Sequence, residues 1–331
     1  MKKTRVLTGI TTTGTPHLGN YVGAIRPAVQ WSQQENVDAF YFLANLHALV
    51  KCQNPAEVQQ SCREIAASWL ALGLDVDRAT FYRQSDVPEI SELAWILTCV
   101  TAKGLMNRSH AYKAAVAENG DHADEPDKGI TMGLFCYPIL MTADILMFNA
   151  NRVPVGKDQI QHLEMARDIA QRFNHIYGEM FVLPEVSIVE EVAILPGLDG
   201  RKMSKSYHNT IPLFCAEKEL LKLIRKIKTN SLEPGQPKDP TDCTLFAWYK
   251  AFANKDEVEN MRKLYAEGIG WGEVKNILFE KINYELTEPR KRYEEWMQNP
   301  DGLERVLLNG AKKARALSVP LLQQIKKAVG V

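Results

Sequence analysis

The sequence has no excess of charge of one sign, no long apolar run and no paired cysteines. Its 331 residues carry 40 Lys+Arg and 40 Asp+Glu, so the overall charge favours neither a nucleic-acid nor a membrane-surface binder. A window of about 18 apolar residues, the minimum for a membrane-spanning helix, is absent. The basic start Met1–Arg5 leads into a Gly/Thr-rich stretch instead of an apolar signal core, so we expect no export signal and a cytoplasmic location.

The six cysteines form no Cys-x-x-Cys pair and have no ligand-like spacing to histidine. We therefore expect buried thiols and no metal site built from the chain. A glycine-rich dinucleotide fingerprint, Gly-x-Gly-x-x-Gly, is also missing. These absences exclude zinc modules, disulfide scaffolds and the common dinucleotide-binding dehydrogenases.

The chain nevertheless has ample material for a core, with 45% hydrophobic and 24% charged residues. Its pattern predicts strands at 4–10, 38–46 and 79–82 and helices at 17–34 and 158–173. Alternation of strands with helices indicates an α/β fold with a parallel sheet. Residues 91–150 are mostly helical in pattern around a polar segment at 119–129, and from 213 onward helical signals dominate, as in Val274, Ile277, Leu278, Ile282 and Leu286. We expect an α/β domain over 1–212, with a helical insertion at about 91–150, and a C-terminal all-helical domain over 213–331.

A glycine-rich turn follows the first predicted strand and precedes a helix, a position that favours anion binding. Gly14 and Gly19 are spaced as in a P-loop, but Asn20 occupies the position of the P-loop lysine. What remains is a loop of hydroxyls followed by two hydrogen-bonding side chains three residues apart, namely Thr11, Thr12, Thr13, His17 and Asn20. These groups suit a phosphate or a ribose, although an ordinary strand-to-helix turn has the same composition.

A second polar motif, Gly200-Arg201-Lys202-Met203-Ser204-Lys205-Ser206, places two lysines three residues apart in a loop. Such a pair suits a triphosphate whose charge must be held while a bond at its α-phosphorus breaks. A solvated basic turn is the alternative for this motif alone.

The third feature is a carboxylate in an apolar run. If residues 133–146 form a helix, then Tyr137, Met141 and Asp144 lie on one face. A buried carboxylate has to be paired, solvated or functional. An apolar wall with one acceptor suits an indole ring and its single N–H, whereas a core helix with Asp144 paired to an arginine is the structural alternative.

Taken together, the first two motifs resemble the His-Ile-Gly-His and Lys-Met-Ser-Lys-Ser signatures of class I aminoacyl-tRNA synthetases. The second signature matches at all five positions, 202–206, and the first departs at Asn20 as in the tryptophanyl and tyrosyl branch. With the segments 137–144, 153–164 and 167–174 added, the whole chain resembles the bacterial tryptophanyl-tRNA synthetases.

The resemblance implies a Rossmann-like nucleotide-binding domain and a tryptophan–tRNA ligase that uses ATP with Mg²⁺ and serves protein biosynthesis. Catalytic roles would fall to His17, Asn20, Lys202 and Lys205. By resemblance, ATP would be lined by Thr11, Thr12, Thr13, Gly19, Asn20, Gly156, Lys157, Asp158, Ile194 or Leu195, Lys202, Met203, Ser204, Lys205 and Ser206. Tryptophan would contact Asp144 through its indole N–H, Met141 and Leu7 along its ring, and Tyr137, Gln159 and His47 at its ammonium and carboxylate.

Two departures from the family leave questions open. Thr11-Thr12-Thr13 stands where much of the family has Gln-Pro-Ser, so contacts of a glutamine amide must be replaced or lost. An Asp/Glu-rich insert follows Lys113, so either Lys113 or Lys128 is the lysine expected to reach the phosphates. His110 and His162 receive no role.

The resemblance also implies tRNA(Trp) as a partner, read at its anticodon by the C-terminal helices, and a homodimer formed through the helices of 91–150. Three basic clusters could contact phosphates or be solvated faces: Arg225, Lys226 and Lys228; Arg290, Lys291 and Arg292; Lys312, Lys313 and Arg315. A tyrosyl-specific enzyme, a small-molecule nucleotidyltransferase and a non-catalytic tryptophan sensor are the rivals. A tyrosyl pocket should have more than one polar group at its floor. A small-molecule nucleotidyltransferase would not need the helical extension at 213–331, and a tryptophan sensor would be expected to lose the lysine loop at 202–206.

Overall fold

A sheet of five parallel strands forms the centre of the part of the chain that the structure describes. The structure is a computed structural model and describes residues 3–119, 125–156, 159–188 and 195–331. The strand order is β3-β2-β1-β4-β5. The strands are β1 (Thr4–Thr11), β2 (Val37–Ala44), β3 (Thr80–Arg83), β4 (Arg152–Val155) and β5 (Glu185–Ile188). The predicted parallel α/β fold is confirmed.

Both faces of the sheet are buried, and β2 shows this most clearly. Phe40 and Phe42 belong to one hydrophobic cluster, whereas Tyr41 and Leu43 belong to the other. Successive side chains of a strand point to opposite faces. A parallel strand covered on both sides therefore reads as a continuous apolar run, which explains why the strand at 38–46 was predictable.

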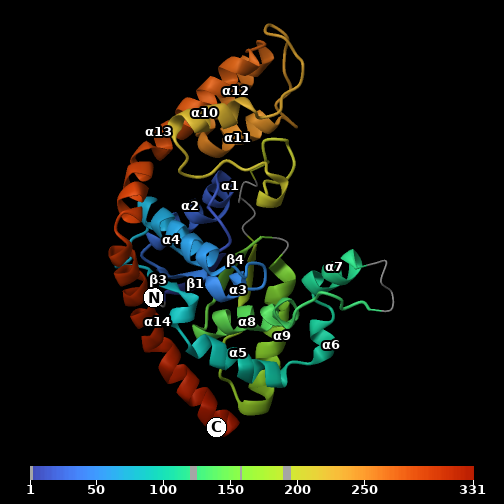
Figure 1. Cartoon of the computed structure of the whole chain (residues 1–331), viewed down its shortest axis with the longest axis vertical. Coiled ribbons are helices and arrows are strands. Elements are labelled where there is room, and N and C mark those ends of the chain that lie inside the picture. Colours follow the sequence, from blue (N-terminus) through green and yellow to red (C-terminus); the bar gives the residue numbers. More distant parts are fainter. Residues whose placement is uncertain (1–2, 120–124, 157–158, 189–194) are drawn as a thin grey trace.

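The helices of this region lie around the sheet (Figure 1). They are α1 (Leu18–Asn20), α2 (Arg26–Ser32), α3 (Asn45–Ala48), α4 (Pro55–Ala71), α5 (Glu89–Val100), α6 (Lys103–Met106), α7 (His110–Glu118), α8 (Met132–Met147) and α9 (Ile160–Tyr177). Helices α6 and α7 extend away from the sheet beside α8 (Figure 1). The mostly helical character expected of 91–150 is confirmed for its described residues, and so is the helix expected at 158–173.

The helix predicted over 17–34 is interrupted. A π-helical turn at Tyr21–Ile25 separates α1 from α2, which begins next to Pro27. Wide turns of this kind occur often at functional sites. Periodicity did not reveal the interruption, since Leu18, Val22 and Ile25 are buried in either geometry.

Strands β4 and β5 were not predicted. Each has four residues, and β4 contains Pro154. Strand β3 is equally short but carries the strand-favouring run Thr80-Phe81-Tyr82. Pro154 in β4 and the mixed composition of β5 instead leave the conformation to pairing with a neighbouring strand.

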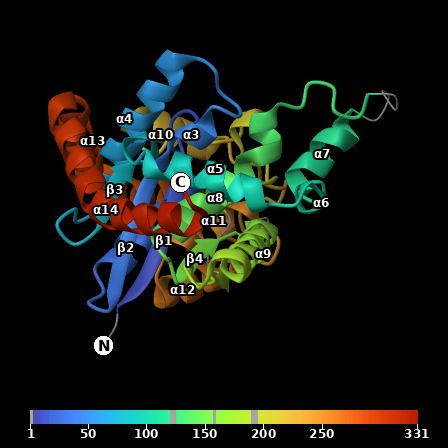
Figure 2. The ribbon, with the colours of Figure 1, turned by 90° about the horizontal axis from the view of Figure 1, so that it is seen from below.

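The C-terminal region is helical, as predicted, and consists of α10 (Glu217–Arg225), α11 (Thr244–Phe252), α12 (Lys255–Ala266), α13 (Trp271–Met297) and α14 (Pro300–Val329). Helices α10 to α12 gather at one end of the elongated molecule (Figure 1). Helix α14 instead runs along the α/β region, where it packs on β3 and α5 (Figure 2).

Gly310 explains how α14 approaches the sheet so closely. A Cβ on Gly310 would lie 1.6 Å from the carbonyl oxygen of Phe81 in β3. The last helix thus completes the α/β layer and does not stand apart from it. The division of the chain at 212 stays a prediction, and α14 is the element on its C-terminal side that packs against the sheet.

Candidate active site

The predicted site residues collect at the carboxyl ends of the strands. The strand β1 leads into the 11–17 turn, β2 into His47, β3 into Gln84 and β4 into Gly156. Strands β2 and β3 lie on one side of β1, whereas β4 and β5 lie on its other side, so the strand order reverses between β1 and β4. In open parallel sheets, ligands bind outside the carboxyl ends of the strands at such a switch point, so the fold itself points to this edge.

A cavity of about 380 Å³ lies at the end of β1. Its lining joins both sequence signatures and consists of Gly9, Ile10, Thr11, Thr13, Gly14, Pro16, His17, Asn20, Ile65, Met203, Ser204 and Lys205. Segments 9–20 and 203–205 thus meet although they are far apart in sequence.

His17 and Asn20 cap the start of α1 for each other. The Asn20 backbone N–H donates to Nδ1 of His17 at 3.3 Å, and Oδ1 of Asn20 accepts from the His17 backbone N–H at 3.1 Å. Burial, with a smaller contribution from the Lys205 charge, lowers the pKa of His17 to about 4. The imidazole is therefore neutral at neutral pH, and both side chains shape the turn as well as facing the cavity.

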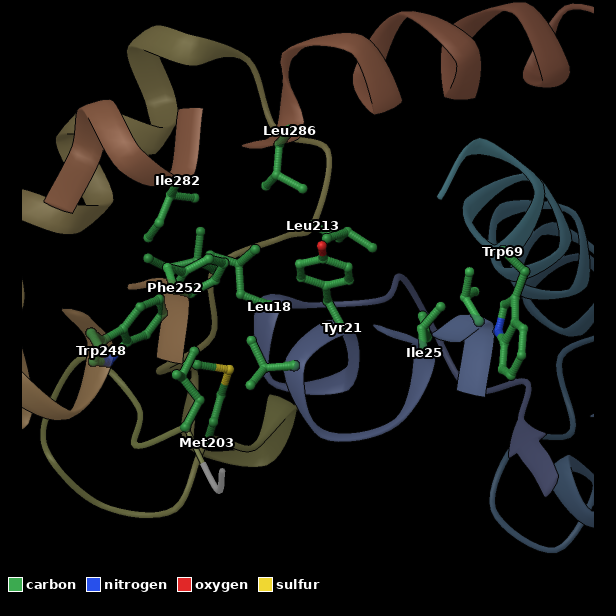
Figure 3. Close-up of a cluster of buried hydrophobic side chains, with 14 of the residues drawn as sticks. Leu18, Tyr21, Ile25, Trp69, Met203, Leu213, Trp248, Phe252, Ile282 and Leu286 are labelled. Atoms are coloured by element: carbon green, nitrogen blue, oxygen red, sulfur yellow. The ribbon is translucent and has the colours of Figure 1, made fainter. Parts of the chain in front are cut away.

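Hydrophobic packing couples the two signatures. Leu18 and Met203 belong to one buried cluster, which Figure 3 shows extending to helices α11 and α13. A Cβ on Gly19 would lie 3.0 Å from both the His17 ring and the Met203 sulfur. A side chain at this position would press on the His17 ring and on Met203, the methionine between the two lysines.

Lys205 reaches back to the first turn. Its ammonium donates to the carbonyl oxygen of Thr13 and would lie 3.1 Å from a Cβ on Gly14. Partial burial lowers the pKa of Lys205, with Glu64 opposing the shift. The Lys202 side chain is exposed. The structure thus places Lys205 in the lining of the cavity, whereas Lys202 is not part of that lining.

Asn209, which the sequence analysis missed, organises the lysine loop. Its buried side chain accepts from the Ser204 N–H at 2.8 Å and donates to the Lys202 carbonyl at 3.1 Å and to Asp199 at 2.8 Å. A Cβ on Gly197 would lie 2.1 Å from its amide nitrogen. The sequence feature that could have pointed to Asn209 was an asparagine at the end of a polar loop, because asparagine side chains often bond to nearby backbone groups.

The remaining predicted nucleotide residues differ in position. Thr11 and Thr13 line the cavity, whereas the Thr12 side chain is fully buried and does not. Leu195 is buried in the cluster that contains Leu18 and Met203, and Gly156 lies just beyond β4. Lys157, Asp158 and Ile194, and the side chain of Ser206, lie outside the described residues.

The predicted carboxylate, Asp144, is 1% exposed in α8. Its Oδ2 lies 2.8 Å from Nε2 of His47, and the amide of Gln84 donates to Oδ1 at 2.8 Å and to Oδ2 at 3.0 Å. Burial raises the pKa of Asp144, and the hydrogen bonds from His47 and Gln84 oppose that shift. In the described residues its ion-pair partner is His47, so the arginine-paired alternative is wrong.

His47 also connects Asp144 to Tyr137. The His47 and Tyr137 rings are 6.3 Å apart in an edge arrangement, and the Tyr137 hydroxyl lies 2.7 Å from Nε2 of His162. His162, for which no role was predicted, holds the Tyr137 hydroxyl through this contact. Gln159 is the N-cap residue of α9, the helix that carries His162.

The apolar residues expected along the indole lie on β1 and α8. Leu7 is buried in the cluster against which Met141 packs. The predicted pocket floor had one acidic acceptor amid apolar walls. The structure adds two polar neighbours, His47 and Gln84, both of which are bonded to that acceptor.

The lysines and the histidine near the acidic insert lie away from the cavity lining. Lys113 is exposed on α7, and Lys128 is 3.8 Å from Glu125. The His110 backbone N–H donates to Gln161 at 2.7 Å. This conformation therefore gives neither lysine a place at the phosphate cavity.

The described residues gather no group of three His, Cys, Asp or Glu side chains suited to hold a metal ion. Across residues 3–119, 125–156, 159–188 and 195–331, none of the helices is long and apolar enough to cross a membrane.

Comparisons with known proteins agree with this geometry. The family model described as "tRNA synthetases class I (W and Y)" matches residues 1–287. Tryptophan–tRNA ligase of Pseudomonas aeruginosa is 60% identical over 331 residues, which cover 99% of this chain and 74% of that protein. Tryptophan–tRNA ligase of Neisseria meningitidis serogroup A is 59% identical over 332 residues, covering 100% of this chain and 99% of that protein.

Solved structures show the same likeness. Tryptophanyl-tRNA synthetase from Campylobacter jejuni, complexed with ADP and tryptophan, is 43% identical with a TM-score of 0.88 and covers 99% of this chain and 100% of that one. Tyrosyl-tRNA synthetase from Archaeoglobus fulgidus, at 19% identity and a TM-score of 0.66, covers 88% of this chain and 90% of that one and shares the fold. The fold is thus common to both specificities, and the pocket has to separate them.

Proposed function

Because the chain belongs to the class I tRNA synthetases of the tryptophan and tyrosine group, we propose that it activates L-tryptophan with ATP and transfers it to tRNA(Trp). The observation that carries the choice of amino acid is the buried carboxylate of Asp144, whose partners among the described residues, His47 and Gln84, both act as hydrogen-bond donors. An indole N–H is a donor without an acceptor function. Identities of about 60% to tryptophan–tRNA ligases support the same choice.

In the first step the ionised carboxylate of tryptophan attacks the α-phosphorus of ATP in line. A carboxylate C–O–P bond forms, the bond between the α-phosphorus and its bridging oxygen breaks, and pyrophosphate leaves. The attacking group is already ionised at neutral pH, so the protein needs no nucleophile of its own. Its task is to align the reactants and to stabilise charge on the phosphates.

The groups that line the 380 Å³ cavity supply that stabilisation of charge on the phosphates. Lys205 exchanges its hydrogen bond to the Thr13 carbonyl for bonds to phosphate oxygens. The exposed Lys202 approaches the phosphates from the solvent side. The backbone of the 11–20 turn and the neutral His17 donate further hydrogen bonds. Thr12 contributes through its backbone, since its side chain is buried.

Among the described residues, no group of three His, Cys, Asp or Glu side chains could hold a metal ion. The magnesium ion would be supplied with ATP. Its charge offsets part of the negative charge of the triphosphate.

In the second step a hydroxyl of the terminal tRNA ribose attacks the acyl carbon, and AMP leaves. Of the three basic clusters, two are engaged within the chain: Arg292 donates to the Ala71 carbonyl, and Arg315 pairs with Glu89 at 2.8 Å. Arg225, Lys226 and Lys228 are exposed, and the described residues give their side chains no ion pair. This cluster is the phosphate contact we propose.

Charge reversal tests that assignment. Arg225→Glu with Lys226→Glu should weaken tRNA binding and reduce its salt dependence, while tRNA-independent adenylation stays at the wild-type rate. Lys291→Glu, whose lysine pairs with Glu288 at 2.7 Å, is the matched control. Equal weakening by the control would contradict the assignment.

We also propose a homodimer formed through the helices of 91–150. An apolar groove of about 460 Å³ lies between α3, α5 and α8, and Trp95 at its edge is 69% exposed. Exposed apolar patches of this kind mark protein interfaces. Trp95→Glu should give monomers in light scattering, whereas Tyr284→Glu, at an 88% exposed tyrosine of α13, should not.

A protein that charges tRNA would act in the cytoplasm.

The deciding experiment is amino-acid-dependent exchange of labelled pyrophosphate into ATP, run separately with each of the twenty amino acids. Exchange with tryptophan alone is expected. Exchange with tyrosine would retain the mechanism and refute the role of Asp144. Exchange with no amino acid would refute the adenylation activity and favour a binding protein.

A further inference from the structure

The side chain of Gln84 is placed as a support for Asp144, a role that neither signature suggested. Gln84 is the first residue after β3 and is fully buried. Its amide nitrogen contacts both carboxylate oxygens of Asp144, at 2.8 and 3.0 Å, and its amide oxygen accepts from the Leu46 N–H at 3.1 Å. Both ends of the amide are satisfied, which sets its orientation.

The backbone that carries Gln84 is held from three directions. Arg83 bonds to Asp86 at 3.0 Å on one side and to Glu304 of α14 at 2.7 Å on the other. Ser85 and Asn45 exchange two hydrogen bonds, at 2.8 and 3.1 Å. The end of β3 is thus attached to α3 and α14, and Gln84 has little freedom to move away from the carboxylate.

The occupied positions on the carboxylate limit what it can receive. An ionised carboxylate has about four acceptor positions. Among the described residues, Gln84 uses one position on Oδ1 and one on Oδ2, and His47 uses the other position on Oδ2. One position therefore remains on Oδ1, and it accepts a donor. His47 contacts only Oδ2, so Gln84 is the described group that orients Oδ1.

We propose that Gln84 is a specificity-determining positioning residue, which holds Asp144 ionised and aims its Oδ1 at the indole N–H of tryptophan. The proposal rests on the function proposed above. Gln84 acts through Asp144 and is not assigned a contact with the substrate. A merely structural amide between β3, α3 and α8 would affect folding, but it would not change how strongly the enzyme requires the N–H group.

The test compares tryptophan with β-(3-benzothienyl)alanine, in which sulfur replaces the indole N–H. Tryptophan-dependent pyrophosphate exchange is measured for wild type and for Gln84→Met, which keeps the volume and removes the amide. We expect kcat/KM for tryptophan to fall about ten- to a hundredfold, mainly through KM, since the carboxylate loses a hydrogen bond to its charged form and its alignment. The preference for tryptophan over the sulfur analogue should shrink by the same factor.

The pH dependence of kcat/KM distinguishes the proposed role of Gln84 from a purely structural one, because a structural role would leave that dependence unchanged. Loss of the amide donor destabilises the ionised carboxylate, so the acid limb of kcat/KM for tryptophan should shift to higher pH in Gln84→Met. Gln84→Glu, nearly the same shape, should lose activity progressively as pH rises, since two carboxylates would then face each other. This isosteric variant also tests the proposal if the methionine variant does not fold.

Gln60→Met is the matched control, because the Gln60 amide also donates to a carboxylate, Glu64, at 2.9 Å, but on the exposed surface of α4. It should behave as wild type. Unchanged analogue preference and pH profile in both folded Gln84 variants would overturn the proposal. Failure of wild type to exchange with tryptophan would instead refute the proposed function, so the two failures are distinguishable.

Discussion

The nucleotide side and the amino-acid side of the site are built in different ways. The nucleotide side consists of two loops, 11–17 and 196–209, with exposed lysines and a cavity of about 380 Å³. The amino-acid side places Asp144 and Gln84, both almost fully buried, between the end of β3 and α8. The nucleotide side faces charge that the substrate brings, whereas the amino-acid side holds a buried carboxyl group of its own.

The difference follows from what each side binds. A triphosphate is highly charged and has to enter and leave, so flexible cations near solvent can serve it. An indole offers one polar atom, so selectivity requires an acceptor shielded from water, and a buried carboxylate needs donors around it. Substitutions should therefore affect rate on one side and recognition on the other.

The largest expected effect is on the nucleotide side. Lys205→Ala should lower kcat of pyrophosphate exchange about 10²- to 10³-fold, the range found when one charge-stabilising donor is removed. Tryptophan affinity, measured by equilibrium dialysis, should change little. Lys222→Ala, at an exposed lysine that pairs with Glu219 at 3.4 Å, is the control. Equal losses of rate and affinity in Lys205→Ala would mean that the lysine acts on the ground state.

The amino-acid side should give the converse result. Asp144→Asn keeps the shape, removes the charge and turns an amide donor toward His47 or Gln84. We expect KM for tryptophan to rise about 10- to 100-fold, as for loss of a hydrogen bond to a charged group, with KM for ATP near wild type. A rise in KM for ATP of the same size would contradict the separation of the two sides.

The scaffold beneath the amino-acid side can be tested through stability. Gly310→Ala would place a Cβ 1.6 Å from the Phe81 carbonyl oxygen, which pushes α14 away from β3. We expect a loss of about 1 to 3 kcal/mol, typical of overpacking, measured by urea unfolding. Gly272→Ala, at a glycine of α13 with open space around it, should be neutral or slightly stabilising. Equal stability of the two variants would refute the close packing of α14.

The smallest effect concerns protonation of the first signature. The pKa of His17 is lowered to about 4 from an ordinary 6.5. The unfolded chain therefore binds the proton more readily, and the contribution of His17 to stability, complete above pH 6.5, declines as the pH falls toward 4. In NMR titrations the His17 ring should stay neutral between pH 7.5 and 5.5, and Lys205→Ala should raise its pKa. Titration of His17 near 6.5 in the wild type would contradict this burial.

The two sides also differed in how far the sequence predicted them. Loop motifs are contiguous, so His17, Asn20 and the 202–206 lysines were found by inspection, and the structure brings 9–20 and 203–205 to one cavity. Asp144 was found because a carboxylate in an apolar helix is costly. Gln84 and Asn209 were missed, because an amide beside an apolar strand or in a polar loop is common, and its partners lie at distant positions such as 144.

The sequence by itself determined the parallel α/β fold, the helical C-terminal region and the two signatures, since these depend on local periodicity and on residues close together in the chain. Only the tertiary structure decided that β4 and β5 are strands, that α14 packs on β3 through Gly310, and that His47 and Gln84 surround Asp144. Each of these depends on contacts between segments far apart in sequence. No local pattern encodes them, because the stabilising partner is supplied by another part of the fold.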